Sequence, residues 1–486
     1  MRNFIRRLIV LPSIAAFVGL GACSDSDSNR GIDPPPPLVD TTTVLTNGVI
    51  TGIGSVYVNG ERYDTEDASV TMDDRPADLL QLEVGQYVEL KGHAHRDGAH
   101  DAEIIRYHNV LEGPITSIDR VGGSFVATGQ TVRVTLDTVF GDDIEPASIE
   151  GLAVGDVVEV SGIVPADGVI DATRLDISPD GGPYDISGYI TSVSIAEQRF
   201  NVSALIVDYS AANMEDFTAS DPAIGDLVKV TGSTFLADGA LLALHVELRS
   251  DDYLTAGPGD LVEVEGVVER FQSITDFRVA GWDVTTTGTT TYEHGTAIDL
   301  SDGVPVIVKG TADSDGVLVA QQIAFRGVST IRIVAQLDEV SAGGDMELLG
   351  VALIATETTV FHDMSALALR EFDLSDLAVG NWLDVRGYED PAGSGTVIAT
   401  HVVRVDPTSS VRMRGPFRDA APPSFDILSV LVTTSDTTRF VLEGNIRITG
   451  DEFFALAPGE LVEAWGAWNA PVLDAERIEL KTSNDE

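Results

Sequence analysis

A nine-residue pattern that recurs along the chain constrains the fold more than any other feature. Its clearest copies are residues 84–92, 154–162 and 224–232, where an aliphatic residue and a Gly lead into an alternating strand that ends in Gly. Weaker copies end at later glycines: Gly310, Gly387 and Gly466. The six closing glycines are 70, 70, 78, 77 and 79 residues apart. Self-similarity with this spacing predicts six tandem copies of one domain.

Each copy also opens on a small residue, 44 to 52 residues before its closing glycine. These opening residues are Gly48, Gly113, Gly188, Gly266, Ala335 and Gly415. Residues 258–266 imitate a closing pattern, but the spacing identifies Gly266 as an opening residue. Alternating stretches between the two ends predict strands, and Asp-Gly pairs after the closing glycine, such as Asp167-Gly168, predict hairpin turns.

The pattern predicts an all-β fold of six small units, each with about five strands and about 70 residues. A closed, OB-like barrel is the first choice because closure removes unpaired strand edges, and a two-sheet sandwich is the alternative. We expect the units to follow one another as beads on a string with modest interfaces. The expected segments are a signal peptide (1–22), a lipidated tether (23–45) and units 1 to 6 (46–110, 111–183, 184–258, 259–330, 331–411 and 412–486).

The first 23 residues have the layout of a secretory signal: Arg2, Arg6 and Arg7, an apolar run over residues 8–20, and Leu-Gly-Ala before Cys23. The apolar run is too short for a membrane span of about 20 residues. The segment resembles the lipobox of bacterial lipoproteins. That resemblance implies cleavage before Cys23, diacylation of its thiol and acylation of its new amino group.

We therefore expect a lipoprotein of the cell envelope, anchored through Cys23. Ser24 and Asp25 follow the cysteine, and the sorting rule of the lipoprotein class then implies the outer membrane, on its periplasmic or surface face. The alternative is a secreted protein in which Cys23, the one cysteine of the chain, is a free thiol. Residues 24–43, with Ser-Asp alternation and four consecutive prolines, are typical of an extended tether.

The opening and closing patterns, with a last strand such as residues 172–177, resemble those of the bacterial domain-of-unknown-function family 5666. The resemblance extends over residues 46–481 and is stronger in units 1 to 3 than in units 4 to 6. It implies repeated β units in an envelope lipoprotein. The family supplies no activity and no catalytic residues to transfer.

The acidity of the chain excludes nucleic acid as a partner. There are 77 Asp and Glu against 30 Lys and Arg, a formal net charge of −47. Phosphate binding depends on Lys and Arg displacing counterions, and the charge has the opposite sign. The excess of acids occurs in each unit, so it is expected to keep an array of units soluble.

No familiar catalytic motif is present in the sequence, so we expect a protein that is not an enzyme. An envelope-polymer hydrolase with paired carboxylates is the last alternative, and a deep acid-lined cleft would favour it. Residues 313–316, Asp-Ser-Asp-Gly, slightly resemble the start of a calcium loop. They also align with the hairpin turns of other units, and a turn is the preferred interpretation.

Four of the eight histidines fall within 16 residues. If Asp97-Gly98 forms a two-residue turn, His95 lies opposite His100, and His93 shares their face of the hairpin. Three imidazoles arranged in this way would bind Zn²⁺ or Cu²⁺ with an open coordination position. The alternative is a solvated polar face. No other cofactor is suggested.

The leading hypothesis is therefore a membrane-anchored, non-enzymatic scaffold or binding protein whose partner is an envelope protein or a polysaccharide. Metal binding through His93, His95 and His100 is the alternative. Trp382 and Trp465 fall inside closing strands and are expected to pack in the core. Trp468 lies beyond a closing glycine and is the tryptophan to test for contact with a ligand.

Overall fold

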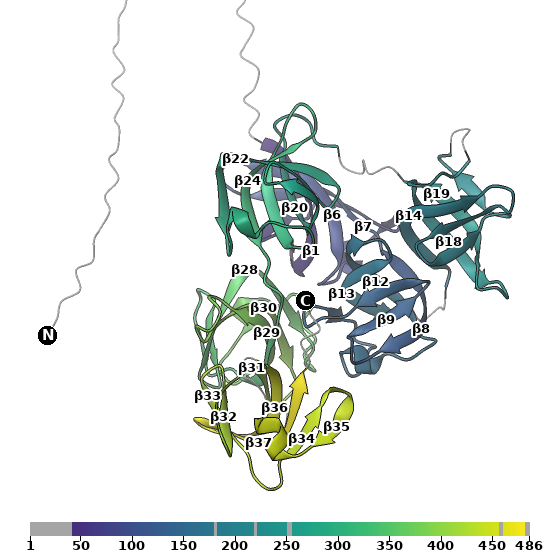
Figure 1. Cartoon of the computed structure of the whole chain (residues 1–486). Coiled ribbons are helices and arrows are strands. Elements are labelled where there is room, and N and C mark those ends of the chain that lie inside the picture. Colours follow the sequence, from purple (N-terminus) through teal and green to yellow (C-terminus); the bar gives the residue numbers. More distant parts are fainter. Residues whose placement is uncertain (1–40, 179–181, 218–220, 250–254, 456–459, 482–486) are drawn as a thin grey trace, which may run out of the picture. The chain divides into compact units, whose positions relative to one another are not determined.

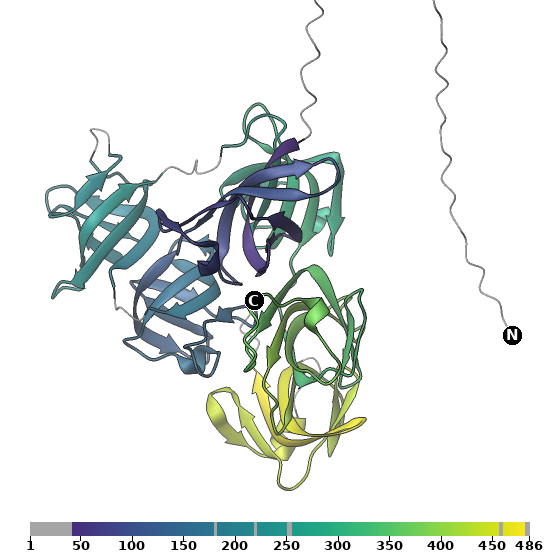
Figure 2. The ribbon, with the colours of Figure 1, turned by 180° about the vertical axis from the view of Figure 1, so that it is seen from behind.

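The computed structural model describes residues 41–178, 182–217, 221–249, 255–455 and 460–481. The predicted signal peptide, Cys23 and most of the tether lie outside these residues. By their contacts, residues Thr41–Glu486 group into one body. Figures 1 and 2 show from opposite sides that the strands of each unit curl around one another.

Unit 2 illustrates how each repeat closes into a barrel. Strands β8 (Leu111–Asp119), β9 (Ser124–Ala127) and β10 (Gln130–Arg133) form an antiparallel meander. β10 then runs parallel to β13 (Val169–Ile177), β13 pairs antiparallel with β12 (Val157–Ala166), and β12 returns to β8. The strand order 1-2-3-5-4-1 is therefore a closed ring, and the predicted OB-like barrel is confirmed.

The other units repeat this order, although some first or third strands are split in two. In units 1 and 4 the strands are β1 (Thr41–Gly52), β2 (Val56–Val58), β3 (Glu61–Asp64), β4 (Ser69–Met72), β5 (Arg75–Ala77), β6 (Tyr87–His95), β7 (His100–Tyr107), β20 (Leu261–Ser273), β21 (Asp276–Val279), β22 (Trp282–Glu293), β23 (Pro305–Ala312) and β24 (Leu318–Phe325). Units 2 and 3 add β11 (Val139–Phe140), β14 (Tyr184–Ser194), β15 (Arg199–Val202), β16 (Leu205–Asp208), β17 (Asn213–Glu215), β18 (Leu227–Phe235) and β19 (Leu241–Leu248). Units 5 and 6 contain β25 (Ile331–Gln336), β26 (Glu339–Val340), β27 (Asp345–Leu348), β28 (Val351–Asp363), β29 (Trp382–Glu389), β30 (Thr396–Val405), β31 (Val411–Ala421), β32 (Ser424–Ile427), β33 (Val430–Thr433), β34 (Arg439–Leu442), β35 (Ile446–Ile448), β36 (Leu461–Asn469) and β37 (Val472–Lys481).

Helical structure in the described residues is confined to short turns. These are η1 (Leu79–Gln81), η2 (Ile149–Gly151), η3 (Ala297–Asp299), η4 (Leu374–Asp376), η5 (Glu443–Asn445) and α1 (Gly450–Phe454). In five units such a turn lies between the third and fourth barrel strands and begins at a polar cap residue, for example Asp373 before η4. Within the part of the chain described, no helix has the length and apolar character needed to cross a bilayer.

The closing glycines have a common structural cause. Each lies in the fourth barrel strand at an irregularity in its pairing with the fifth, as Gly162 does in β12. A Cβ on Gly162 would overlap the carbonyl oxygen of Asp171, and a Cβ on Gly232 would lie 2.7 Å from the Leu242 carbonyl oxygen. Only glycine allows the two backbones to approach this closely, so the repeated residue reports how the barrel closes.

The units are not independent beads, and that expectation is wrong for the described residues. The first strands of two units pair in each sheet: β8 with β14, β25 with β31, and β1 in parallel with β20. Units 2 and 3 therefore share one sheet, as do units 5 and 6 and units 1 and 4. One hydrophobic core is continuous through units 2 and 3, and another through units 5 and 6.

Charged side chains also bridge units that are distant in the sequence. Lys309 of unit 4 donates to Glu61 of unit 1 at 2.8 Å, and Arg386 of unit 5 donates to the carbonyl oxygen of Leu136 in unit 2 at 2.9 Å. Lys229 of unit 3 donates to Asp73 of unit 1 at 3.1 Å. Both Arg386 and Lys229 are largely buried. Because an unpaired buried charge is costly, these contacts hold the units in defined positions.

Candidate functional site

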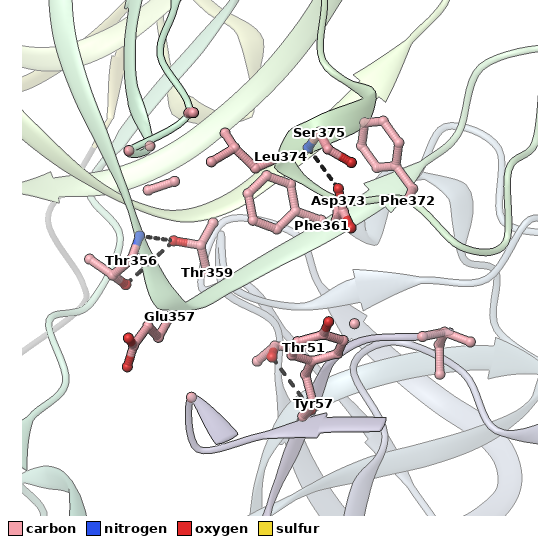
Figure 3. Close-up of a pocket in the computed structure, with 17 residues that line it drawn as sticks. Thr51, Tyr57, Thr356, Glu357, Thr359, Phe361, Phe372, Asp373, Leu374 and Ser375 are labelled. Carbon is pink, nitrogen blue, oxygen red and sulfur yellow. Dashed lines mark hydrogen bonds between the residues drawn. The ribbon is translucent and has the colours of Figure 1, made fainter. Parts of the chain in front are cut away.

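A pocket of about 550 Å³ lies between unit 1 and unit 5 (Figure 3). Unit 1 supplies the end of β1 and the strand β2, with Thr51 and Tyr57. Unit 5 supplies the loop 342–344, the middle of β28 and the segment that enters η4. The volume lies in the range of small-ligand sites, and the pocket is partly open to solvent.

Aromatic side chains form much of the pocket wall. Figure 3 shows Phe361 and Phe372 of unit 5 on one side and Tyr57 of unit 1 on the other. The two phenylalanine rings meet edge to face, with centroids 6.4 Å apart and planes at 70°. Phe372 is buried, whereas Tyr57 and Phe361 are half-buried and retain exposed ring surface. The wall therefore offers apolar surface to a ligand.

The local sequence explains these positions. Tyr57 lies between Val56 and Val58, which both point into the barrel of unit 1, so the pleat turns the tyrosine outward. Phe361 differs, because it packs against the core of units 5 and 6, whereas its neighbour Val360 packs in the core of unit 1. For Tyr57, an outward-facing aromatic between inward-facing valines was a signal available in the sequence.

A second pocket of about 590 Å³ lies where units 1 to 4 meet. Glu89, Glu269, Asp302 and Tyr189 are among the residues that line it. Burial raises the pKa of Glu89 to about 7 against the lowering influence of nearby arginines, and its Oε2 atom has no hydrogen-bond partner among the described residues. Burial also raises the pKa of Glu269. Arg270 and Arg278 line the pocket as well, so its lining carries both acidic and basic side chains.

A row of carboxylates crosses the sheet that units 2 and 3 share. Glu159 of β12 pairs with Glu112 of β8, which pairs in turn with Asp185 of β14, so the three side chains stand side by side on one face. Tyr107 of unit 1 covers the row and donates from its hydroxyl to Glu159 at 2.7 Å. Burial, with the neighbouring carboxylates, raises the pKa of Glu159 to about 7. We call these three residues the acidic row.

The histidines that the sequence predicts as a metal site do not share one face. Ala94, rather than His95, pairs with His100, because the hairpin has a three-residue loop, Arg96-Asp97-Gly98. His93 and His95 both face Asp101, with His93 Nδ1 at 3.4 Å from its Oδ2 atom.

His100 lies on the opposite face of the hairpin, with Nδ1 3.8 Å from Glu61 and its ring centroid 5.3 Å from that of Tyr63. The predicted register is therefore wrong. Among the described residues, no group of three His, Cys, Asp or Glu side chains has a geometry suited to a metal ion.

The tryptophans have mainly structural surroundings. Trp382 and Trp468 are partly buried and pack against the core of units 5 and 6. Trp465 is flanked by the guanidinium groups of Arg412 and Arg477, whose Cζ atoms lie 5.0 and 4.8 Å from the ring centroid. The predicted calcium-like segment is a turn, because the carboxylate of Asp313 accepts backbone N–H groups from within its own loop.

The fold and the contacts between units, which we call seams, define the class of protein: a tandem array of OB-like barrels joined through shared sheets. Six segments match the family described as Domain of unknown function (DUF5666): residues 47–106, 112–176, 187–247, 265–324, 334–403 and 414–479. The chain belongs to this family.

Two further comparisons add little to this assignment. No curated protein matches the chain. A solved structure described as "drosophila Unr CSD456" is similar at 14% identity, covering 45% of this chain and 97% of that chain, with a TM-score of 0.13.

Proposed function

We propose that this protein is an envelope lipoprotein, anchored through Cys23, that acts as a non-enzymatic multi-domain binding scaffold. The lipobox supports the anchor, and the length of the predicted tether supports a position away from the membrane surface. The observation that carries the binding role is the aromatic-walled pocket between units 1 and 5. Its walls come from units about 300 residues apart in the chain, so the joined array builds a site that a single unit lacks.

The joined barrels support a scaffold rather than a flexible spacer. Arg370 of unit 5 donates to the carbonyl oxygens of Leu79 and Leu82 in unit 1, at 3.1 and 2.7 Å, and Val360 of unit 5 packs in the core of unit 1, so these contacts fix the two walls of the pocket relative to each other. A site whose walls are already in place loses less conformational freedom when a ligand binds, which increases affinity. The outer membrane, and an envelope polysaccharide or protein as partner, are parts of the same proposal.

Site-specific photocross-linking in native membranes tests this function. A benzoylphenylalanine in place of Tyr57 keeps an aromatic ring in the pocket, and the same residue in place of Ile446, which is exposed in unit 6, is the matched control. We expect a defined adduct from position 57 that is absent from position 446. Identical adducts from both positions, or none from position 57, would contradict a binding site in this pocket.

The buried Glu89 in the pocket of units 1 to 4 favours a second candidate, an envelope-polymer hydrolase. A carboxyl group with a pKa near 7 is suited to act as a general acid at neutral pH, and Glu89 has that property. Zymography on cell-wall polymers with wild type, Glu89→Gln and the exposed control Glu197→Gln decides it. Activity lost only in Glu89→Gln supports the candidate, and an inactive wild type ends it.

A further inference from the structure

The charge of the pocket between units 1 and 5 limits the ligands that it can accept. Among its described lining residues, the charged side chains are Glu357 and Asp373, both acidic, and neither Lys nor Arg lines it. An anionic group placed there would meet repulsion without a compensating cation. Phosphorylated, sulfated and carboxylated ligands therefore fit poorly, which leaves neutral and cationic ones.

The features that would hold an organic cation are already engaged. The guanidinium of Arg404 lies 4.5 Å from the centroid of the Phe372 ring, so this ring already interacts with a positive charge. Asp373 accepts the backbone N–H of Ser375 at 2.6 Å as the cap of η4. Glu357 is exposed at the pocket edge, where water screens its charge.

The remaining groups are aromatic surface and hydroxyls. Tyr57 and Phe361 are half-buried lining residues, and Thr51, Thr356 and Ser375 also line the pocket. The Thr51 hydroxyl already donates to the carbonyl oxygen of Tyr57 at 3.4 Å, so it offers a ligand an acceptor. A sugar ring has an apolar C–H face and a rim of hydroxyl groups, so it matches both features. We infer that this pocket binds a neutral saccharide; the inference rests on the proposed binding function and names its ligand class.

The pocket also lies on the part of an OB-like barrel that is suited to such a ligand. Its unit 5 wall is made by the third barrel strand, β28, and by the loop between the first two, residues 342–344. OB-folds use the second and third strands and this first loop to bind oligosaccharides and oligonucleotides, and the acidic lining excludes the latter.

The loop of unit 5 is small where the ligand would lie. It reads Ala342-Gly343-Gly344, and Gly344 has a φ of 92°. A Cβ on Gly344 would lie 2.6 Å from the carbonyl oxygen of Ala355, so a side chain would both strain the loop and push it from β28. Glycine therefore keeps the loop close to the strand and leaves the volume of the pocket open.

The test is a titration of the chain from Ser24 onward on an array of neutral glycans, followed by calorimetry with the best trisaccharide. Benzyltrimethylammonium is the cationic probe, and a sulfated form of the same trisaccharide is the anionic one. The variants are Tyr57→Ala, which removes one ring, Glu357→Gln, which removes the charge at the pocket edge, and Ile446→Ala, an exposed apolar control in unit 6. Circular dichroism checks that each variant is folded.

We expect a neutral trisaccharide to bind, Tyr57→Ala to weaken it about tenfold and Glu357→Gln to change it by less than about twofold. The sulfated sugar and the ammonium probe should not bind. No binding to any neutral glycan, unchanged binding by Tyr57→Ala, or loss of binding by Ile446→Ala alone would overturn the inference. If the cross-link at position 57 captures a ligand that is not a saccharide, the proposed binding function is supported and the inferred ligand class is wrong.

Discussion

Neutralising one member of the acidic row should change how the stability of unit 2 depends on pH. Glu159 stands beside Glu112 and beneath the hydroxyl of Tyr107, and its pKa rises from 4.5 to about 7 in the folded chain. A folded state with a raised carboxyl pKa holds its proton more tightly than the unfolded state does. This stabilisation is complete below pH 4.5 and is lost as the pH rises through about 7.

The size of the effect follows from the two pKa values. A difference of about 2.5 units corresponds to about 3 kcal/mol of free energy, of which about 2.5 kcal/mol is lost between pH 5 and pH 8. Glu159→Gln keeps the shape of the side chain and an acceptor for the Tyr107 hydroxyl, but it cannot ionise. Relative to wild type, the variant should therefore gain about 2.5 kcal/mol between pH 5 and pH 8.

Urea unfolding at the two pH values, followed by far-UV circular dichroism, measures this gain. All four tryptophans lie at residue 282 or later, so tryptophan fluorescence would not follow unit 2. Hydrogen exchange of peptides from β8 and β12, compared at equal pH, locates the change. Glu197→Gln, an exposed substitution in unit 3, is the control and should show no gain. A difference between wild type and Glu159→Gln that is the same at pH 5 and pH 8 would refute the reasoning.

Three further predictions follow from the fold and the sequence. Gly162→Ala forces a Cβ against a backbone carbonyl and should cost about 2 kcal/mol by thermal unfolding, whereas Gly288→Ala, where a Cβ meets nothing within 4 Å, should cost much less. Arg386→Met leaves the carbonyl oxygen of Leu136 without its donor and should increase hydrogen exchange where units 2 and 5 meet by about tenfold; unchanged exchange there would contradict this role. Cys23→Ser should abolish labelling by radioactive palmitate and release the protein from the membrane fraction, and retained labelling would exclude Cys23 as the anchor.

The barrel could be predicted from the sequence because its closure imposes a local requirement. The fourth strand must pass very near the fifth, and only glycine permits this at Gly92, Gly162 and the equivalent positions. The spacing of the closing glycines therefore predicted the number of units. The alternating apolar and polar residues between each opening and closing residue predicted the strands. The segment 258–266 was separated from a true closing pattern by spacing alone, and Gly266 lies in the first strand of unit 4.

The side of the hairpin on which each histidine lies could not be predicted, because it changes when the strand pairing shifts by one residue. An Asp-Gly pair serves either as a two-residue loop or as the end of a three-residue one. Here Gly98 takes a φ of 89°, while Asp97 accepts the N–H of Ala99 and closes a local turn. The loop is longer by one residue than we assumed, and the shift turns His100 to the opposite face.

The sequence also did not predict which units pair with each other, because the first strands that join two units are alike in every copy. The start of each first strand pairs with the fourth strand of its own barrel on one side and with the first strand of another unit on the other side, as Glu112 does with Glu159 and Asp185. Units 2 and 3 pair as neighbours, but unit 1 pairs with unit 4 through β1 and β20, and neither strand carries a local signal that selects its partner. The chemistry that distinguishes the copies is concentrated where they meet: the acidic row, Glu89 and the Tyr57 pocket all lie at seams. Substitutions at seam residues should therefore alter binding more than substitutions at equivalent positions on exposed barrel faces, even though both sets belong to the same repeat.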